Sequence, residues 1–173
     1  MNAIRFKQWQ IIENHNQKDP LFNIKELIKA IVFSQNEKYV IFNDTIFTSR
    51  LNDKIYGRIR QEDEGIRFTL DRSIVDTPEA RYTYALLLAV YMEFIQYEHR
   101  SNIVVYVTSD WEAISADIDL VSRGAQGRII DLARSILIND DLFDDNFSVK
   151  VLADRFQVPK RVILEKLEEY EPS

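Results

Sequence analysis

Residues 76–97 read DTPEARYTYALLLAVYMEFIQY, and this stretch decides the fold. Thr77 is a suitable N-cap, and Pro78 fits the first helical position, where its missing N–H costs nothing. Asp76 and Glu79 place negative charge at the positive end of the helix dipole. The sequence therefore predicts a helix that begins after Thr77 and runs to Tyr97.

No charged side chain occurs between Tyr82 and Met92, and apolar groups point in every direction around the predicted helix. A helix that is apolar on all faces must be covered by the rest of the protein. The run is also shorter than the roughly 20 residues that a membrane span needs. We therefore expect this helix to be the buried centre of the fold.

The composition is that of an ordinary folded domain, with 173 residues, 46% hydrophobic and 29% charged. Because there is no cysteine, disulfides, thiolate catalysis and cysteine-ligated metals are excluded. The only histidines are His15 and His99, too few for a multi-histidine metal site in one chain. The net charge of −6 argues against broad nucleic-acid binding, which depends on Lys and Arg.

The N-terminal region shows no apolar run after a basic segment, and residues 14–19 are already polar. We therefore expect a cytoplasmic protein that makes no membrane contact. Within this region, the spacing of apolar residues predicts a short amphipathic helix in residues 1–16, ended by Asp19-Pro20. Two further helices are predicted at residues 22–33 and 119–137, each with an apolar stripe.

Short runs rich in β-branched and aromatic residues separate these helices and predict strands at residues 39–42, 45–49, 54–60, 65–71 and 103–107. The polar turn at residues 61–65 ends in Gly65 and joins two alternating strands, which predicts an antiparallel hairpin. Its apolar face should lie on the helix that follows. The segments at residues 110–112 and 115–117 are interpreted as acidic connections. The fold class is therefore α+β, with a small, mainly antiparallel sheet packed on the central buried helix.

We divide the chain into three segments. Residues 1–50 form a helical and strand segment assigned to the same domain as the next, residues 51–140 form the α+β core, and residues 141–173 form a C-terminal helical segment. The last segment reads as the first two helices of a helix-turn-helix, with Ser148 as N-cap and a tight turn at residues 157–159.

Residues 81–91, RYTYALLLAVY, resemble the helix of the ImmA/IrrE-type zinc peptidases, whose usual run is R-F-T-x-A-H-E-x-G-H-Y. In that motif two histidines four residues apart bind zinc, and the glutamate after the first one activates the metal-bound water. Here Leu86 and Val90 stand at the histidine positions, Leu87 at the glutamate position and Ala89 at the glycine position. The scaffold residues match, whereas the residues that carry the chemistry do not.

The resemblance continues in the third predicted helix, where the family usually has E-x-x-A-N-x-F-A-x-x-L-L-M-P and the glutamate completes the zinc site. Leu132-Ala133 aligns with the Phe-Ala pair and places Gln126 at the glutamate position. Residues 148–167 resemble the family's closing L-A-x-x-F-x-V-S segment and final helix. Together the similar segments cover residues 56–167.

Leucine and valine have no lone pair for zinc, and burying a divalent cation among alkyl groups costs several kcal/mol or more. We therefore expect no catalytic residue, no metal and no cofactor. An alternative is a metallopeptidase with a displaced metal site built from Glu93, Glu98 and His99. Their spacing does not place them on one helical face. His15 lies in a polar run and is expected at the surface.

An acidic run, NDDLFDDN at residues 139–146, invites a calcium interpretation through Asp140, Asp141, Asp144 and Asp145. It lacks the glycine and the terminal glutamate of a calcium loop, so we expect an acidic connection that caps the next helix.

The resemblance implies a non-catalytic relative of these peptidases that regulates by binding another protein, in that family commonly a helix-turn-helix repressor of a phage or mobile element. Trp9, Trp111 and Phe143 are candidate contact anchors. The alternative is a DNA-binding regulator that uses Lys160 and Arg161 in the C-terminal segment. Acidic residues at the end of the last helix argue against it, so we do not expect a nucleic-acid partner.

Overall fold

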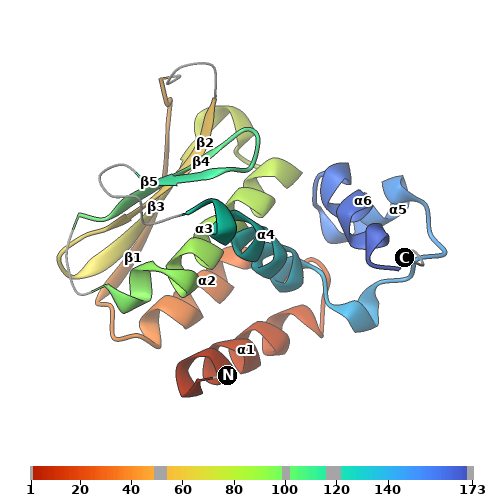
Figure 1. The fold of residues 1–173 in the computed structure, drawn as a ribbon, viewed down its shortest axis with the longest axis horizontal. Coiled ribbons are helices and arrows are strands. Elements are labelled where there is room, and N and C mark those ends of the chain that lie inside the picture. The colour runs from red at the N-terminus through yellow and green to blue at the C-terminus, as the bar shows by residue number, and fades with distance from the viewer. Residues whose placement is uncertain (1, 49–53, 99–101, 116–121, 171–173) are drawn as a thin grey trace.

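The computed structural model describes residues 2–48, 54–98, 102–115 and 122–170, and it confirms an α+β fold. Helices α2, α3 and α4 gather on one side of a mixed sheet, α1 lies beyond them, and α5 and α6 form a pair at one end (Figure 1). The helices are α1 (Ala3–Asn16), α2 (Ile24–Phe33), α3 (Pro78–Glu93), α4 (Arg123–Leu137), α5 (Val149–Phe156) and α6 (Lys160–Glu168). The strands are β1 (Tyr39–Thr45), β2 (Ile55–Gln61), β3 (Gly65–Asp71), β4 (Val104–Thr108) and β5 (Ala113–Ser115).

The sheet has the strand order β1-β3-β2-β4-β5. Strands β2 and β3 form the predicted antiparallel hairpin, with Ile59 opposite Phe68, while β1 runs parallel to β3. The buried face of β2 lies against α3. At Gly57 a Cβ atom would stand 2.6 Å from Thr83 Cγ2, so glycine is what allows the helix to approach the sheet so closely.

Helix α3 is the buried centre of the fold, as predicted. The side chain of Thr77 caps it by accepting a hydrogen bond from the N–H of Ala80 at 3.3 Å, and every residue from Tyr82 to Met92 is buried. The predicted end at Tyr97 is wrong, because α3 ends at Glu93 and is followed by a 3-10 turn, Ile95–Tyr97. The side-chain nitrogen of Gln96 donates to the Met92 carbonyl at 2.6 Å, where the backbone N–H of a continuing helix would bind.

Two other boundaries differ from the sequence-based prediction. Residues 45–49 do not form a strand of their own in their described part. The N–H of Phe47 binds the Asp71 carboxylate at 3.0 Å instead of a neighbouring strand. Strand β5 was not predicted: its last residue, Ser115, was assigned to a connection, and three residues are too short to show alternation. Residues 119–121 of the predicted third helix lie outside the described residues.

The buried core runs through all three predicted segments and includes Ile28 from the first, Leu87 from the second and Phe156 from the third. Of the helices in the described ranges, none is both long and apolar enough to cross a bilayer.

One half-buried cation, Arg81, joins distant parts of the chain. The guanidinium of Arg81, near the start of α3, donates to the carbonyl oxygens of Pro20 and Phe22 at 3.1 Å each and also to that of Phe156 at the end of α5. It also lies 4.7 Å from the ring centre of Phe22. Burial lowers the pKa of Arg81 to about 10, so the side chain remains charged at neutral pH.

Replacing Arg81 with methionine keeps an apolar stem but leaves three carbonyl oxygens without their donor. We expect Arg81→Met to lower the free energy of unfolding by about 3 kcal/mol in urea titrations. Arg72→Met is the matched control, because Arg72 pairs with Asp44 at an exposed position. We expect this variant to lower the free energy of unfolding by less than about 1 kcal/mol. Equal losses in the two variants would contradict a structural role specific to Arg81.

Candidate functional site

The three positions that would carry zinc chemistry in the resembling helix lie in the core. Leu86 is 1% exposed, and Leu87 and Val90 are fully buried. One turn before Leu86, Tyr82 stacks on Trp111, with ring centres 4.8 Å apart. This part of α3 packs against α4, so alkyl and aromatic groups occupy the space between the two helices.

Gln126, which the resemblance predicts to stand at the glutamate position of the zinc site, makes two hydrogen bonds with backbone groups. Its side-chain oxygen accepts from the N–H of Ala113 at 3.0 Å, and its side-chain nitrogen donates to the Ala113 carbonyl at 2.7 Å. Ala113 begins β5, the edge strand on this side of the sheet. The amide of Gln126 therefore attaches α4 to the sheet edge, using both its donor and its acceptor.

Gln126→Glu tests this attachment, because an ionised carboxylate cannot donate to the Ala113 carbonyl. We expect a loss of about 2 kcal/mol in the free energy of unfolding at neutral pH. The loss should shrink at acidic pH, because only the protonated carboxyl can donate. The introduced carboxyl therefore has a higher pKa in the folded variant than in its unfolded chain. The free energy of unfolding of the variant then falls as the pH rises through this pKa.

Gln10→Glu is the control, since Gln10 is exposed on α1 and should show little change at either pH. A stability of Gln126→Glu that does not depend on pH would contradict the two-bond arrangement.

The alternative metal sites are not assembled in the described part of the chain. No group of three His, Asp or Glu side chains among those residues is placed to hold a metal ion. Of the predicted displaced site, Glu93 forms an ion pair with Arg5 at 2.9 Å. His99, another residue of that predicted site, lies outside the described residues. In the acidic run, Asp140 pairs with Lys166.

The three candidate contact anchors are buried or half-buried, and His15, which was predicted at the surface, is half-buried. Trp111 is 8% exposed and packs in the core. Trp9 and Phe143 are half-buried and pack against the core. His15 is half-buried, with its Nδ1 atom 2.9 Å from the Ile11 carbonyl oxygen. Sequence spacing alone did not reveal these contacts, because each depends on a distant segment.

The C-terminal helices have the predicted turn, with Ser148 capping α5 and Gln157 in the left-handed region at φ 51°. Lys160 and Arg161 are exposed at the start of α6, as a DNA contact would require. Arg161 pairs with Glu165 at 3.1 Å, however, so part of its charge is balanced within the helix.

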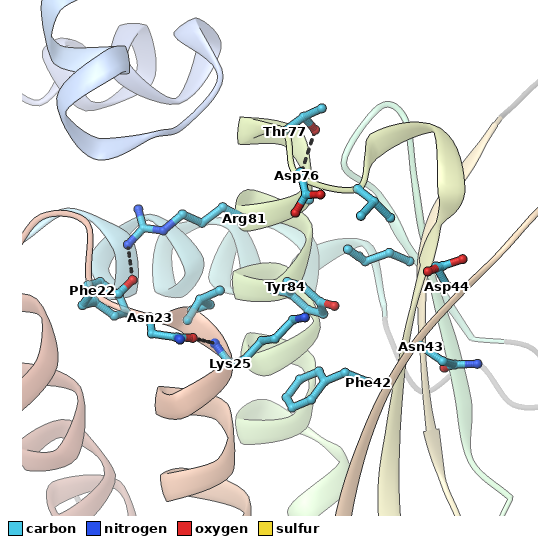
Figure 2. Close-up of a pocket in the computed structure, with 14 residues that line it drawn as sticks. Phe22, Asn23, Lys25, Phe42, Asn43, Asp44, Asp76, Thr77, Arg81 and Tyr84 are labelled. Carbon is cyan, nitrogen blue, oxygen red and sulfur yellow. Dashed lines mark hydrogen bonds between the residues drawn. The ribbon is translucent and has the colours of Figure 1, made fainter.

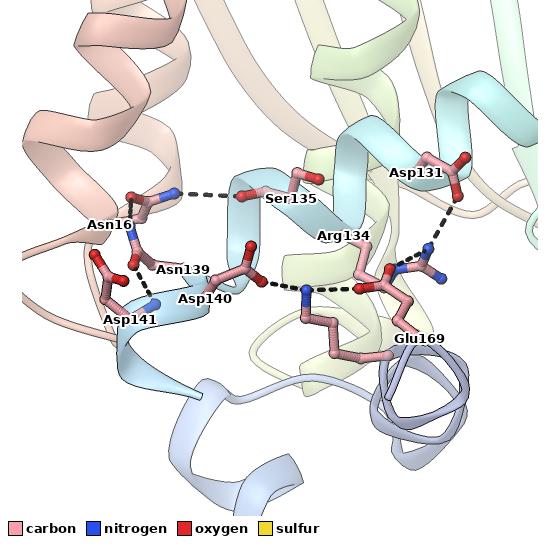
Figure 3. A network of polar contacts seen from close by, with 9 residues as sticks. Asn16, Asp131, Arg134, Ser135, Asn139, Asp140, Asp141 and Glu169 are labelled. Carbon is pink, nitrogen blue, oxygen red and sulfur yellow. Dashed lines mark hydrogen bonds and ion pairs between the residues drawn. The ribbon is translucent and has the colours of Figure 1, made fainter. Parts of the chain in front are cut away.

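A polar network fastens this helical pair to α4 (Figure 3). Arg134 binds Asp131 at 3.0 Å and Glu169 at 2.9 Å, and Lys166 binds Glu169 at 2.9 Å and also Asp140. Burial acts to lower the pKa of Lys166, but its hydrogen bonds to Asp140 and Glu169 outweigh this and raise it. The inner side of α6 is therefore held within the protein.

An open pocket lies between the start of α2, strand β1 and the start of α3 (Figure 2). Its volume is about 440 Å³. The Lys25 ammonium lies 5.6 Å from the ring centre of Phe42 and 5.8 Å from that of Tyr84. Asp76 also lines the pocket, and its carboxylate makes no hydrogen bond or ion pair with a described residue.

This pocket borders an open edge of the sheet. Strand β1 is the outermost strand, and no other described strand pairs with its outer side. Burial raises the pKa of Tyr84 to about 12, so its hydroxyl stays protonated beside Lys25. Sequence reasoning missed the pocket because its walls come from three segments with no shared motif. The unusual left-handed conformation of Asp76, with φ 63°, is not visible in a sequence.

Comparisons with known proteins do not assign this chain to a family. No protein-family model matches it, and no curated protein matches it either.

Proposed function

We propose that this chain is a non-catalytic relative of the ImmA/IrrE-type peptidases that acts in the cytoplasm as a regulator by binding another protein. The observation that carries the proposal is that α3 resembles the peptidase helix but differs from it at the positions of its zinc ligands and base. The helix keeps the scaffold residues of the peptidase helix, while Leu86, Leu87 and Val90 replace its ligands and base and are buried. Gln126, at the fourth position, is committed to the backbone of Ala113.

The partner we propose is a helix-turn-helix repressor of a phage or other mobile element, as the resemblance implies. Such a repressor presents a basic surface to DNA. This chain carries a net charge of −6, which favours its long-range encounter with a basic partner. Binding without cleavage would block or steer the repressor in a one-to-one complex.

The pocket beside β1 is the surface we propose for this contact. The Asp76 carboxylate, which has no partner among the described residues, suits a basic side chain of the partner, while Lys25 already lies over the rings of Phe42 and Tyr84 beside it. The adjacent edge of β1 offers backbone groups to an extended segment. The DNA-binding alternative has less support, because Arg161 is paired with Glu165 and the helix ends in acidic residues.

The test is to titrate the purified chain with repressors encoded near its gene and to measure binding by calorimetry with and without EDTA. We expect one repressor to bind, to remain intact by mass spectrometry, and to bind equally well with the chelator. Asp76→Asn should weaken binding by about tenfold, because it removes one unpaired charge yet tolerates the left-handed backbone.

Asp145→Asn is the matched control, since it removes the same charge from an exposed position far along the chain. We expect it to change repressor binding little. Cleavage of the repressor that stops on addition of EDTA would contradict the proposal and favour a displaced metal site.

A further inference from the structure

A second pocket lies at the opposite end of α3, near its C-terminus. Its volume is about 560 Å³. Its walls come from the start of α1, the loop between α2 and β1, the turn between β2 and β3, and the last turn of α3 with the residues after it. The proposed repressor contact does not involve this pocket, and of the residues aligned with the peptidase motif only Tyr91 lines it.

Two buried polar atoms in the pocket wall lack partners. Tyr91 is 0% exposed, and its hydroxyl makes no hydrogen bond. The side-chain oxygen of Gln61 is also buried without a partner. Because the great majority of buried polar atoms in proteins are paired, two unpaired ones in the wall of one pocket indicate a ligand that supplies donors. Burial, together with the charge of Glu37, raises the pKa of Tyr91, so its oxygen remains a neutral acceptor.

The charges around the pocket favour a cation. Glu37 and Asp63 line it and have no ion-pair partner in the described part of the chain, and burial raises the pKa of Glu37. Glu62 also lines it, but Arg67 already binds this carboxylate at 2.9 Å. None of the described residues in the wall is basic. The C-terminus of α3 adds the negative end of its dipole at the same place.

The acceptors come from different segments, with the Tyr91 hydroxyl on α3, the Gln61 side-chain oxygen at the end of β2 and the Glu37 carboxylate in the loop before β1. Among the described residues no three carboxylate or imidazole groups are placed to hold a metal ion. A guanidinium group fits such a wall better, because it is flat and carries five N–H donors that can reach separate acceptors. An ammonium group is a compact, strongly hydrated charge and would satisfy fewer of them.

We propose that this pocket binds a guanidinium group, either from free arginine or a derivative of it, or from an arginine side chain of another protein. The Tyr91 hydroxyl and the Gln61 side-chain oxygen accept its N–H groups, and Glu37 is its counter-ion. This site does not depend on the proposed repressor binding, and the two can fail separately.

The test uses the full chain and L-argininamide in calorimetric titrations at low salt. We expect saturable one-to-one binding and clearly weaker binding of L-lysinamide. Tyr91→Phe should weaken argininamide binding by about tenfold, because it removes an acceptor for a charged donor. The same variant should melt at the same temperature as the parent or higher, since the lost hydroxyl bonds nothing in the free protein.

Glu37→Gln should also weaken binding and reduce its dependence on salt, whereas Glu168→Gln, at an exposed position on α6, should leave it unchanged. An acetylated and amidated Gly-Arg-Gly peptide distinguishes the sources. Tighter binding of the peptide identifies a protein side chain, and tighter binding of argininamide identifies a small molecule. The proposal is overturned if argininamide does not saturate, if lysinamide binds as tightly, or if Tyr91→Phe binds like the parent.

Discussion

The constraint on which the structure depends is that α3 is apolar on every side and must be covered completely. Each fully buried Leu, Val or Met side chain contributes about 1.5–3 kcal/mol relative to exposure, so an uncovered face would be costly. The sheet covers one side, where Gly57 lets the helix come close, and α2 and α4 cover the others. The remaining elements are arranged around this requirement.

Polar side chains determine how the helices and strands around α3 are held in place. Arg81 joins the start of α3 to the loop before α2 and to the end of α5. Gln126 attaches α4 to β5, and the network around Arg134 and Lys166 attaches the C-terminal pair to α4. Hydrogen bonds of this kind add modest stability, but they specify which surfaces of the surrounding helices and strands pack together. Gln126, which the resemblance predicts to stand at a zinc-ligand position, is a structural link in this fold.

Periodic patterns in the sequence predicted α3, α2 and the hairpin of β2 and β3, because burial on one or all faces leaves a direct mark on residue spacing. Strand β5 and the early end of α3 were missed, since the first is too short for a pattern and the second depends on the side chain of Gln96. At the candidate site, the resemblance to the peptidase helix singled out Leu86, Val90 and Gln126 as positions to inspect, and this alignment stays a prediction. It did not show that Gln126 binds Ala113, because that contact joins segments whose pairing only the fold defines. The two pockets were also missed, because their walls combine residues from separate segments.

The central claim is that residues 86–90 of α3 lie in a closed core. Hydrogen–deuterium exchange of the amides of residues 86–90 tests it most directly. A sealed core predicts that these amides exchange only through global unfolding, at the same rate and with the same denaturant dependence as the slowest amides of β2 and β3. Exchange of residues 86–90 through local opening, much faster than in those strands, would show an accessible cleft at this position and contradict the account.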